Sequence, residues 1–341
     1  MTELTVKTSS REYPVFVSDS LSSLGKALGV MKGEKVAIVT DENVSALYPL
    51  VEGFFGEKSV YKFVIEAGEN SKSPENFIKI QNFLAENGFT RSDSVVAFGG
   101  GVVGDLAAFC ASTYMRGITL VAIPTTILSA VDSSVGGKTA INLDRGKNLC
   151  GSFYQPSAVY ICTEFFKTLP EREIACGLGE VIKYAFLSDT VTIEDVKGET
   201  SVNLIEKCLK IKADIVGRDE NERGDRKLLN LGHTVGHAIE RLSGFGISHG
   251  ECVVKGLFAI LNISKRYFGL SDNAYERALE VISCRGHDLD IGFSAEEIYG
   301  QILSDKKSDG SGVDLVLICE DLSAKIVRVS YIELKELLKW I

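Results

Sequence analysis

The sequence predicts an α/β nucleotide-binding domain over residues 1–170 and a mainly α-helical domain over residues 171–341. Its 341 residues allow two or three domains, at about 100–200 residues each. The first half alternates short β-branched runs with longer helical patterns, whereas the second half carries helical spacing with few strand-like runs. Strands separated by helices indicate a mostly parallel sheet with helices on its faces.

Short runs rich in β-branched residues are the predicted strands of the first domain. They cover residues 35–40, 62–65, 94–98, 119–123 and 158–162. Residues 74–87 place Phe77, Ile80 and Leu84 at helical spacing, which predicts an amphipathic crossover helix. In the second domain we expect helices at residues 201–216, 227–242, 251–268 and 275–284, and a late hairpin from residues 313–318 and 325–329.

Charge and hydrophobicity exclude several classes of protein. The 37 basic and 46 acidic side chains give a net charge of −9, whereas nucleic-acid binding needs a basic face. The charge-free run in the apolar middle of the sequence, from Gly117 to Val131, contains Pro124 and is too short to span a membrane. The first residues lack the basic and then apolar order of a signal peptide. The eight cysteines form no Cys-x-x-Cys motif, so we expect reduced, buried thiols in a cytoplasmic protein.

A glycine-rich turn follows the third predicted strand. Gly99, Gly101 and Gly104 satisfy the pattern G-x-G-x-x-G and precede a helix that we expect to begin near Asp105. Missing side chains let backbone amides approach a pyrophosphate, and a helix N-terminus adds partial positive charge. As a dinucleotide fingerprint the turn is imperfect, because no acid follows at about twenty residues. Phosphate binding and a structural turn therefore both stay open.

The sequence Gly-Gly-Lys-Thr at residues 136–139 is not a P-loop. That motif needs a glycine seven positions before the Thr, where this chain has Asp132. Lys138 belongs instead to a set of basic residues beside polar, glycine-containing turns, which could form an anion pocket although each could equally be a solvated surface cation. The set is Arg116, Lys138, Lys147, Lys183, Arg226 and the pair Lys306 and Lys307.

Three of the four histidines, His233, His237 and His249, fall close together in the sequence. His233 and His237 are four residues apart on a predicted helix, so both lie on one face. Two imidazoles and a nearby carboxylate are typical ligands of a zinc-type ion. The spacing lacks the Glu of His-Glu-x-x-His, which disfavours a metalloprotease. The pattern favours a metal site over core histidines, in a two-domain enzyme with a nucleotide, a metal and an anionic substrate.

Eight motifs occur in order along the chain, at residues 99–105 (GGGVVGD), 124–126 (PTT), 131–142 (VDSSVGGKTAIN), 146–148 (GKN), 153–156 (FYQP), 177–184 (GLGEVIKY), 230–240 (NLGHTVGHAIE) and 248–251 (SHGE). In this order they closely resemble the 3-dehydroquinate synthase family. The resemblance covers essentially the whole chain, and the combined motifs are highly specific.

The resemblance implies a carbon–oxygen lyase of the shikimate pathway, which leads to the aromatic amino acids. Its substrate would be the sugar phosphate 3-deoxy-D-arabino-heptulosonate 7-phosphate, and its products 3-dehydroquinate and phosphate. NAD would transiently oxidise a hydroxyl, phosphate would be eliminated, the ketone would be reduced again, and an intramolecular aldol step would close the ring. A divalent metal, Zn²⁺ or Co²⁺, would polarise the hydroxyl by lowering its pKa.

By the same resemblance, Glu180, His233 and His249 are the metal ligands, and His237 has a proton-relay role instead. Arg116 would contact the phosphate and can reach across from the partner subunit of a homodimer. The other substrate contacts would be Lys138, Asn148, Lys183, Lys212, Arg226, Asn230 and Lys306, with Lys307 as the alternative to Lys306. The NAD contacts would be Asp41, Asn43, Glu69, Lys72, Gly100, Gly101, Val102, Asp105, Thr125, Thr126, Asp132, Ser133, Lys138, Lys147, Thr168 and Glu173.

Three alternatives remain at this level. Another sugar phosphate cyclase, such as 2-deoxy-scyllo-inosose synthase or a valiolone-forming synthase, would differ in the pocket for the substrate carboxylate, and the intact segment 136–139 disfavours it. A metal-dependent polyol dehydrogenase would begin its metal set with an Asp, whereas Glu180 heads this one. A non-enzymatic NAD sensor would not need Glu180, Lys138 and both histidines together.

Overall fold

The computed structural model describes residues 1–305 and 312–341. Its contacts divide the chain into a first unit, Met1–Leu169 with Thr200–Gly217, and a second unit, Pro170–Glu199 with Arg218–Ile341. The predicted boundary after residue 170 stays a prediction, but the helical segment at 200–217 groups with the first unit. There the Lys212 ammonium contacts Asp132, and Gly217 lies against the Lys7 carbonyl.

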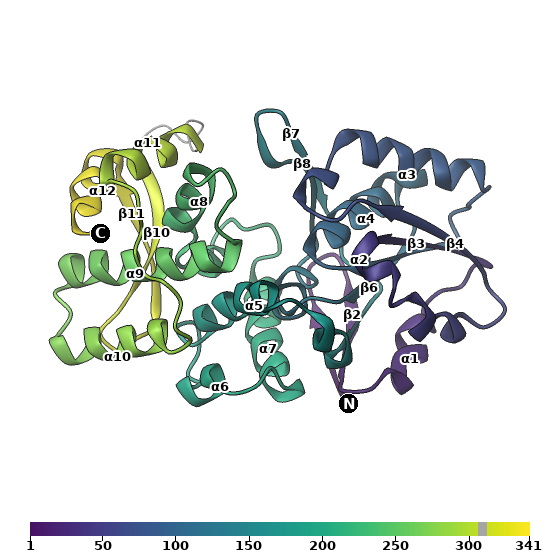
Figure 1. The fold of residues 1–341 in the computed structure, drawn as a ribbon, viewed down its shortest axis with the longest axis horizontal. Helices are drawn as coiled ribbons and strands as arrows, with labels where there is room; N and C mark the ends of the chain where they lie inside the picture. The colour runs from purple at the N-terminus through teal and green to yellow at the C-terminus, as the bar shows by residue number, and fades with distance from the viewer. Residues whose placement is uncertain (306–311) are drawn as a thin grey trace. The chain divides into compact units, whose positions relative to one another are not determined.

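The first unit is built around a seven-stranded sheet with the order β1-β2-β9-β6-β5-β3-β4 (Figure 1). The pair β1–β2 is antiparallel, and the other neighbours in this sheet are parallel. Its strands are β1 (Thr2–Lys7), β2 (Glu12–Ser18), β3 (Lys35–Asp41), β4 (Ser59–Ile65), β5 (Ser94–Gly99), β6 (Thr119–Pro124) and β9 (Ala158–Cys162). All five predicted strands are confirmed, whereas β1 and β2 were not predicted.

Helices cover the faces of this sheet because its central strands are apolar on both sides. Every residue of β5 is buried, as expected of a strand inside a parallel sheet. Ala97, Ile80 and Leu106 belong to one buried cluster that joins β5 to α3 and α4. The helices of the unit are α1 (Leu24–Leu28), α2 (Glu42–Ser45), α3 (Pro74–Glu86), α4 (Gly101–Thr113) and α7 (Val202–Arg218). The predicted crossover helix, α3, is confirmed.

The direction of strand addition reverses between β3 and β5. β3 is followed by β4 on one side, whereas β5 is followed by β6 on the other. In α/β sheets, ligands bind outside the carboxyl ends of the strands at such a switch point. Asp41 ends β3 and Gly100 follows β5, so two of the predicted NAD contacts flank this position.

An antiparallel hairpin, β7 (Lys138–Leu143) with β8 (Gly146–Phe153), falls outside the predicted strands. Its two segments contain two glycines and only two β-branched residues, so they lack the composition of a strand. Ile141 of β7 belongs to the same buried cluster as α4. Tertiary packing therefore stabilises this hairpin, although the local β-propensity of its segments is low.

The second unit is mainly helical and carries one small hairpin (Figure 1). Its helices are α5 (Glu171–Tyr184), α6 (Ile193–Lys197), α8 (His233–Leu242), α9 (His249–Phe268), α10 (Asp272–Ser283), α11 (Ala295–Asp305) and α12 (Tyr331–Leu337). The predicted hairpin is confirmed as β10 (Gly312–Ile318) and β11 (Ala324–Ser330), and the predicted helices at 251–268 and 275–284 correspond to α9 and α10. Among the described residues, none of the helices combines the length and apolarity that crossing a membrane requires.

The predicted helix over residues 227–242 is wrong in its first part. Residues Asp225–Asn230 form a 3-10 turn, and α8 begins only at His233. Between them Gly232 adopts a φ of 79°, a conformation that glycine reaches without a steric cost. A Cβ there would also lie 2.9 Å from the Val253 carbonyl oxygen of α9. The glycine therefore ends the turn and lets α8 start against α9.

Candidate functional site

The glycine turn is itself the start of helix α4, which corrects the predicted start near Asp105. Gly100 is the N-cap and Gly101 the first helical residue, and the Gly104 N–H donates to the Gly100 carbonyl at 2.9 Å. A Cβ on Gly99 would lie 2.6 Å from the Val103 side chain. The strand-to-helix turn therefore leaves no space for a Cβ at Gly99. Gly100, Gly101 and Val102 form the N-terminal turn of α4. Asp105 lies in the following turn.

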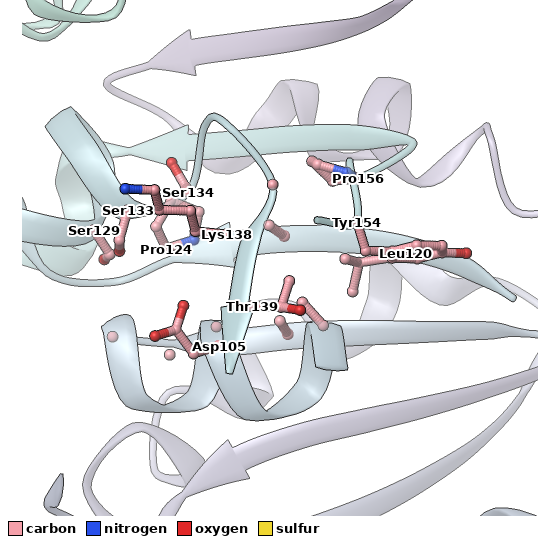
Figure 2. A pocket seen from close by; sticks show the side chains of 17 residues that line it. Asp105, Leu120, Pro124, Ser129, Ser133, Ser134, Lys138, Thr139, Tyr154 and Pro156 are labelled. Atoms are coloured by element: carbon pink, nitrogen blue, oxygen red, sulfur yellow. The ribbon is translucent and has the colours of Figure 1, made fainter. Parts of the chain in front are cut away.

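A pocket in the first unit lies beside this helix start (Figure 2). Asp105, Ser133 and Lys138 line it, with Gly100 at the end of β5. Among the described residues, the hydroxyls of Ser134 in the pocket wall and of nearby Thr125 are buried without a hydrogen-bond partner. A buried hydroxyl without a protein partner is a group that a bound water or ligand can satisfy.

Asp105 is held by a buried lysine. The Lys72 ammonium lies 2.7 Å from Asp105 Oδ2 and 3.9 Å from Glu69 Oε1, and Lys72 is 4% exposed. Burial raises the pKa of Asp105, against the opposing charge of Lys72. Three of the residues predicted to contact NAD thus form one electrostatic cluster.

The other predicted nucleotide contacts lie at several positions. The Asp41 carboxylate accepts the Val44 N–H at 2.9 Å and caps α2, which contains Asn43. Thr126 Oγ1 lies 2.8 Å from Ser129 Oγ, at the start of the π-helical turn Ser129–Ser133 that carries Asp132. The remaining three are Lys147 in β8, Thr168 in the 3-10 turn Thr163–Thr168, and Glu173 in α5 of the second unit.

Four predicted substrate contacts belong to the first unit. Lys138 begins β7, and Asn148 of β8 has a φ of 58°. The Lys212 ammonium contacts both the carbonyl and the carboxylate of Asp132. Arg116 has a φ of 68° in the turn after α4, a left-handed conformation that is costly for a side chain of this kind.

In the second unit, Glu180 of α5, His233 of α8 and His249 of α9 converge on one point. Glu180 Oε1 lies 3.2 Å from His233 Nε2 and 3.0 Å from His249 Nε2, and the Glu180 side chain is fully buried. Small residues allow this convergence, because a Cβ on Gly179 would collide with the Gly250 carbonyl of α9. The structure therefore brings together the three predicted metal ligands.

His237 lies next to the same cluster. It follows His233 by one turn of α8, and one ring nitrogen from each of the three histidines lies within 4.8 Å of the others. Two ligand sets therefore fit the geometry, the three histidines or Glu180 with His233 and His249. The second set remains our prediction.

The Nδ1 atoms of the two predicted histidine ligands, His233 and His249, each have a polar partner. His233 Nδ1 lies 3.0 Å from the Leu231 carbonyl oxygen, and His249 Nδ1 lies 3.3 Å from Glu240 Oε2. Because a carbonyl only accepts, His233 Nδ1 is the donor, and Nε2 is the ring nitrogen that faces Glu180. Glu240 was not predicted as a site residue. Its position seven residues after His233, on the same face of α8, is the signal that could have identified it.

Electrostatics divide the cluster into charged and neutral groups. Burial acts to raise the pKa of Glu180, but the charges of Lys183 and His233 and two histidine hydrogen bonds hold it well below its usual range. Burial acts to lower the pKa of His249, but hydrogen bonds to Glu180 and Glu240 raise it to about 10. Burial and then the charges of His233 and His249 lower the pKa of His237 to about 3. At neutral pH and without a metal, Glu180 is anionic, His249 cationic and His237 neutral.

The remaining predicted substrate contacts include three residues of the second unit. The Lys183 ammonium lies 2.6 Å from Glu180 Oε2, and both side chains are almost wholly buried. The buried Arg226 guanidinium donates to the Glu220 carbonyl, and Asn230 Nδ2 donates to Glu222 Oε1 at 2.7 Å. Lys306 lies outside the described residues.

Both parts of the sequence match models of one protein family. Residues 62–176 match the family model "3-dehydroquinate synthase N-terminal" and residues 177–308 match "3-dehydroquinate synthase C-terminal", together more than half of the chain. A 3-dehydroquinate synthase of Alkaliphilus metalliredigens is 40% identical over 336 residues, which cover 93% of this chain and 92% of the relative.

Two solved structures have the same fold. A 2-deoxy-scyllo-inosose synthase with carbaglucose-6-phosphate, NAD⁺ and Co²⁺ superposes with a TM-score of 0.88 at 23% identity, covering 99% of both chains. The 2-epi-5-epi-valiolone synthase of Streptomyces hygroscopicus subsp. jinggangensis, with NAD⁺ and Zn²⁺, gives a TM-score of 0.83 at 23% identity, covering 96% of this chain and 95% of that one. The sequence matches, over nearly the whole length, go further than the fold: this chain belongs to the 3-dehydroquinate synthase family.

Proposed function

We propose that this protein converts 3-deoxy-D-arabino-heptulosonate 7-phosphate to 3-dehydroquinate and phosphate, as a 3-dehydroquinate synthase of the shikimate pathway. The observation that carries the proposal is the convergence of Glu180, His233 and His249 in a chain of this family. Family membership disfavours a polyol dehydrogenase. A protein that only sensed NAD would not need Glu180, His233 and His249 together.

The residues of the second unit fit a divalent metal. The donor set is one buried carboxylate and two imidazoles whose Nδ1 atoms are already held by Leu231 and Glu240, and such N/O donors suit Zn²⁺ or Co²⁺. We propose Glu180, His233 and His249 as the ligands. When bound, the ion polarises a substrate hydroxyl and lowers its pKa.

The residues of the first unit fit NAD. The glycines at the start of α4 leave backbone amides accessible, and the orphan hydroxyls of Thr125 and Ser134 offer hydrogen bonds nearby. We propose that Gly100, Gly101 and Val102 hold the pyrophosphate, with Asp41 and Asn43 at the adenosine ribose. NAD held there would supply reversible hydride transfer within one turnover.

The chain's own residues then bind and orient the substrate. Lys138, Lys183, Lys212 and Arg226 supply positive charge for the carboxylate and phosphate, while Asn148 and Asn230 supply amides for hydroxyls. Lys183 also neutralises Glu180, so its ammonium is held in a defined position at the buried carboxylate. His237 lies one turn of α8 from His233, beside the cluster, and we propose it for the proton-relay role; with a pKa of about 3 its ring is neutral at pH 7.

We also propose a homodimer in the cytoplasm. All eight cysteines are free thiols, as is usual in a reducing compartment. The exposed turn at Arg116 would present that guanidinium to the site of a second copy. Solution mass from light scattering tests the dimer, and a monomer would exclude this role of Arg116.

The test of the activity is phosphate release from the heptulosonate phosphate, with catalytic NAD⁺ and added Zn²⁺ or Co²⁺. We expect phosphate in large excess over any NADH detected by absorbance, because the hydride returns to the substrate. Absent phosphate, with NADH accumulating on polyols instead, would contradict the proposal. Turnover of glucose 6-phosphate in its place would favour another sugar phosphate cyclase.

A further inference from the structure

Asn142 lies at an irregular point of the β7–β8 hairpin. The pairing passes from Ile141 with Cys150 to Leu143 with Gly146, so Asn142 alone stands opposite residues 147–149. Such irregularities release a residue from the ladder and re-aim its side chain. The Asn142 N–H donates to the Lys72 carbonyl at 2.8 Å, in the loop before α3.

The side-chain amide of Asn142 joins two different loops. Its Nδ2 donates to Glu69 Oε1 at 2.7 Å, and its Oδ1 accepts the backbone N–H of Asn148 at 2.9 Å. A carboxylate only accepts and a backbone N–H only donates, so these partners fix the orientation of the amide. Neither a carboxylate nor an aliphatic side chain at position 142 could make both bonds.

Each partner of Asn142 belongs to a different side of the proposed site. Glu69 and Lys72 are proposed NAD contacts, and the Lys72 ammonium holds Asp105 in the pocket wall at 2.7 Å. Asn148 is a proposed substrate contact with a left-handed φ of 58°, a conformation that asparagine adopts more readily than most L-residues. The hydrogen bond from its backbone N–H to Asn142 ties this part of the hairpin to Asn142.

We propose that Asn142 is a positioning residue, whose amide couples the nucleotide side of the site, through Glu69 and Lys72, to Asn148 on the substrate side. The inference rests on the proposed function for the roles of these neighbours. Asn142 acts through them, and its two hydrogen bonds can be removed separately.

The first experiment is a double-mutant cycle read by the NAD dissociation constant in calorimetry. Asn142→Asp keeps the acceptor for Asn148 but sets a carboxylate against Glu69, so NAD binding weakens about tenfold. In the Glu69→Gln background the new carboxylate accepts from the Gln amide, and the same change weakens binding less than about threefold. Leu143→Asp adds the same charge on a neighbouring side chain that is 43% exposed, and it changes binding less than about twofold.

The second experiment uses the protein without NAD and follows hydrogen exchange at the Asn148 amide. Asn142→Ala removes the acceptor, so exchange accelerates about tenfold or more, whereas Asn142→Asp retains wild-type protection. Thermal unfolding of each variant verifies that the fold is retained. This readout requires neither substrate nor turnover.

The outcomes separate this inference from the proposed function. Equal effects of Asn142→Asp in the wild-type and Glu69→Gln backgrounds, or unchanged exchange at Asn148 in Asn142→Ala, would overturn the coupling role while leaving the enzyme activity standing. A wild-type protein that binds no NAD, yet shows the predicted exchange behaviour, would instead contradict the proposed function.

Discussion

At the scale of single residues, Glu180 combines full burial with a negative charge. Its carboxylate contacts the Lys183 ammonium and the Nε2 atoms of His233 and His249. A buried charge is stable only when partners replace its hydration. The same partners position the carboxylate where a metal ion would bind, so electrostatic stability and metal affinity depend on one cluster.

Replacement of Glu180 by Gln separates the two ligand sets that fit the geometry. We expect Zn²⁺ affinity to fall at least about 100-fold, because a neutral amide is a poor ligand. Lys183 also loses its carboxylate, so the free energy of unfolding decreases by about 3–5 kcal/mol. Titration calorimetry with Zn²⁺ and urea unfolding measure the two effects.

The control is Glu171→Gln on the same helix, which is exposed and should change neither quantity. The reciprocal variant, His237→Ala, should retain Zn²⁺. Tight Zn²⁺ binding by Glu180→Gln together with its loss in His237→Ala would replace the proposed set by the three histidines.

Asp93 shows how a buried carboxylate stabilises the first unit. It is 4% exposed and accepts the Lys35 N–H at 2.9 Å and the Thr90 N–H at 2.7 Å. Burial acts to raise the pKa of Asp93, but these hydrogen bonds and the Lys35 charge lower it overall. Stability from a lowered pKa is present above the unfolded value of about 3.9 and is lost as the pH falls through the folded value.

We therefore expect Asp93→Asn to lower the free energy of unfolding by about 1–3 kcal/mol at pH 7. The amide has a single acceptor oxygen, so it can accept the N–H of Lys35 or of Thr90 but not both. The difference from wild type should begin to shrink below about pH 4, where the carboxyl of the unfolded chain becomes protonated, and should vanish as the pH falls through the lower pKa of the folded protein. Urea unfolding across this pH range measures it, with the exposed Asp189→Asn as control. A difference that stays constant with pH would mean that the charge is not the cause.

At the scale of elements, the metal cluster depends on how closely α5 and α9 approach. Gly179 faces the Gly250 carbonyl, and Gly250 faces the Cys176 carbonyl, with no space for a Cβ at either position. In both contacts the opposing atoms are backbone, which cannot move as a side-chain end would. The spacing between α5 and α9 that brings Glu180 to His249 therefore depends on these two glycines.

Gly179→Ala should therefore push α5 away from α9. We expect the free energy of unfolding to fall by about 1–3 kcal/mol, as for overpacked cores, and Zn²⁺ affinity to fall about tenfold or more. Thermal unfolding and Zn²⁺ calorimetry measure the two effects.

Gly300→Ala is the matched control, because Gly300 lies in α11 with no atom near the position of a Cβ. It should be neutral or stabilise the protein by up to about 1 kcal/mol, since alanine favours helix over glycine. Equal behaviour of the two variants would show that the close approach does not limit the site.

At the scale of the whole molecule, the two cofactors are assigned to different compact units. All proposed NAD contacts except Glu173 belong to the first unit, and the three proposed metal ligands belong to the second. A ligand stabilises the native segments that it contacts, by about 2.7 kcal/mol at a concentration 100 times its dissociation constant. Each cofactor should therefore protect its own unit.

Hydrogen exchange resolved by segment tests this assignment. NAD should slow exchange in β3, β5 and the start of α4, and should still do so after chelation of the metal. Zn²⁺ should slow exchange in α5, α8 and the start of α9, and Glu180→Gln should abolish that effect. Protection of α8 by NAD in the metal-free protein, without protection of β5, would contradict the assignment.

The sequence predicted well where local pattern and tertiary environment agree. The buried strands β3, β5 and β6 are continuous apolar runs because parallel strands are covered on both faces, so their composition alone identifies them. The sequence-based prediction was wrong where the role of a glycine depends on its contacts with another segment of the chain. The start of α4 at Gly101 and the break before α8 at Gly232 depend on neighbouring backbone that a single segment does not contain.

The same distinction applies to the site and to the protein as a whole. The sequence by itself determined the fold class, the family and the residue types of the site, because apolar periodicity and ordered motifs are properties of the chain. Only the tertiary structure decided that Glu180 meets His233 and His249, that Glu240 holds His249, and that Asn142 joins Glu69 to Asn148. These contacts connect residues from separate elements or loops, and their distances are set by helix crossings and strand register rather than by spacing along the chain.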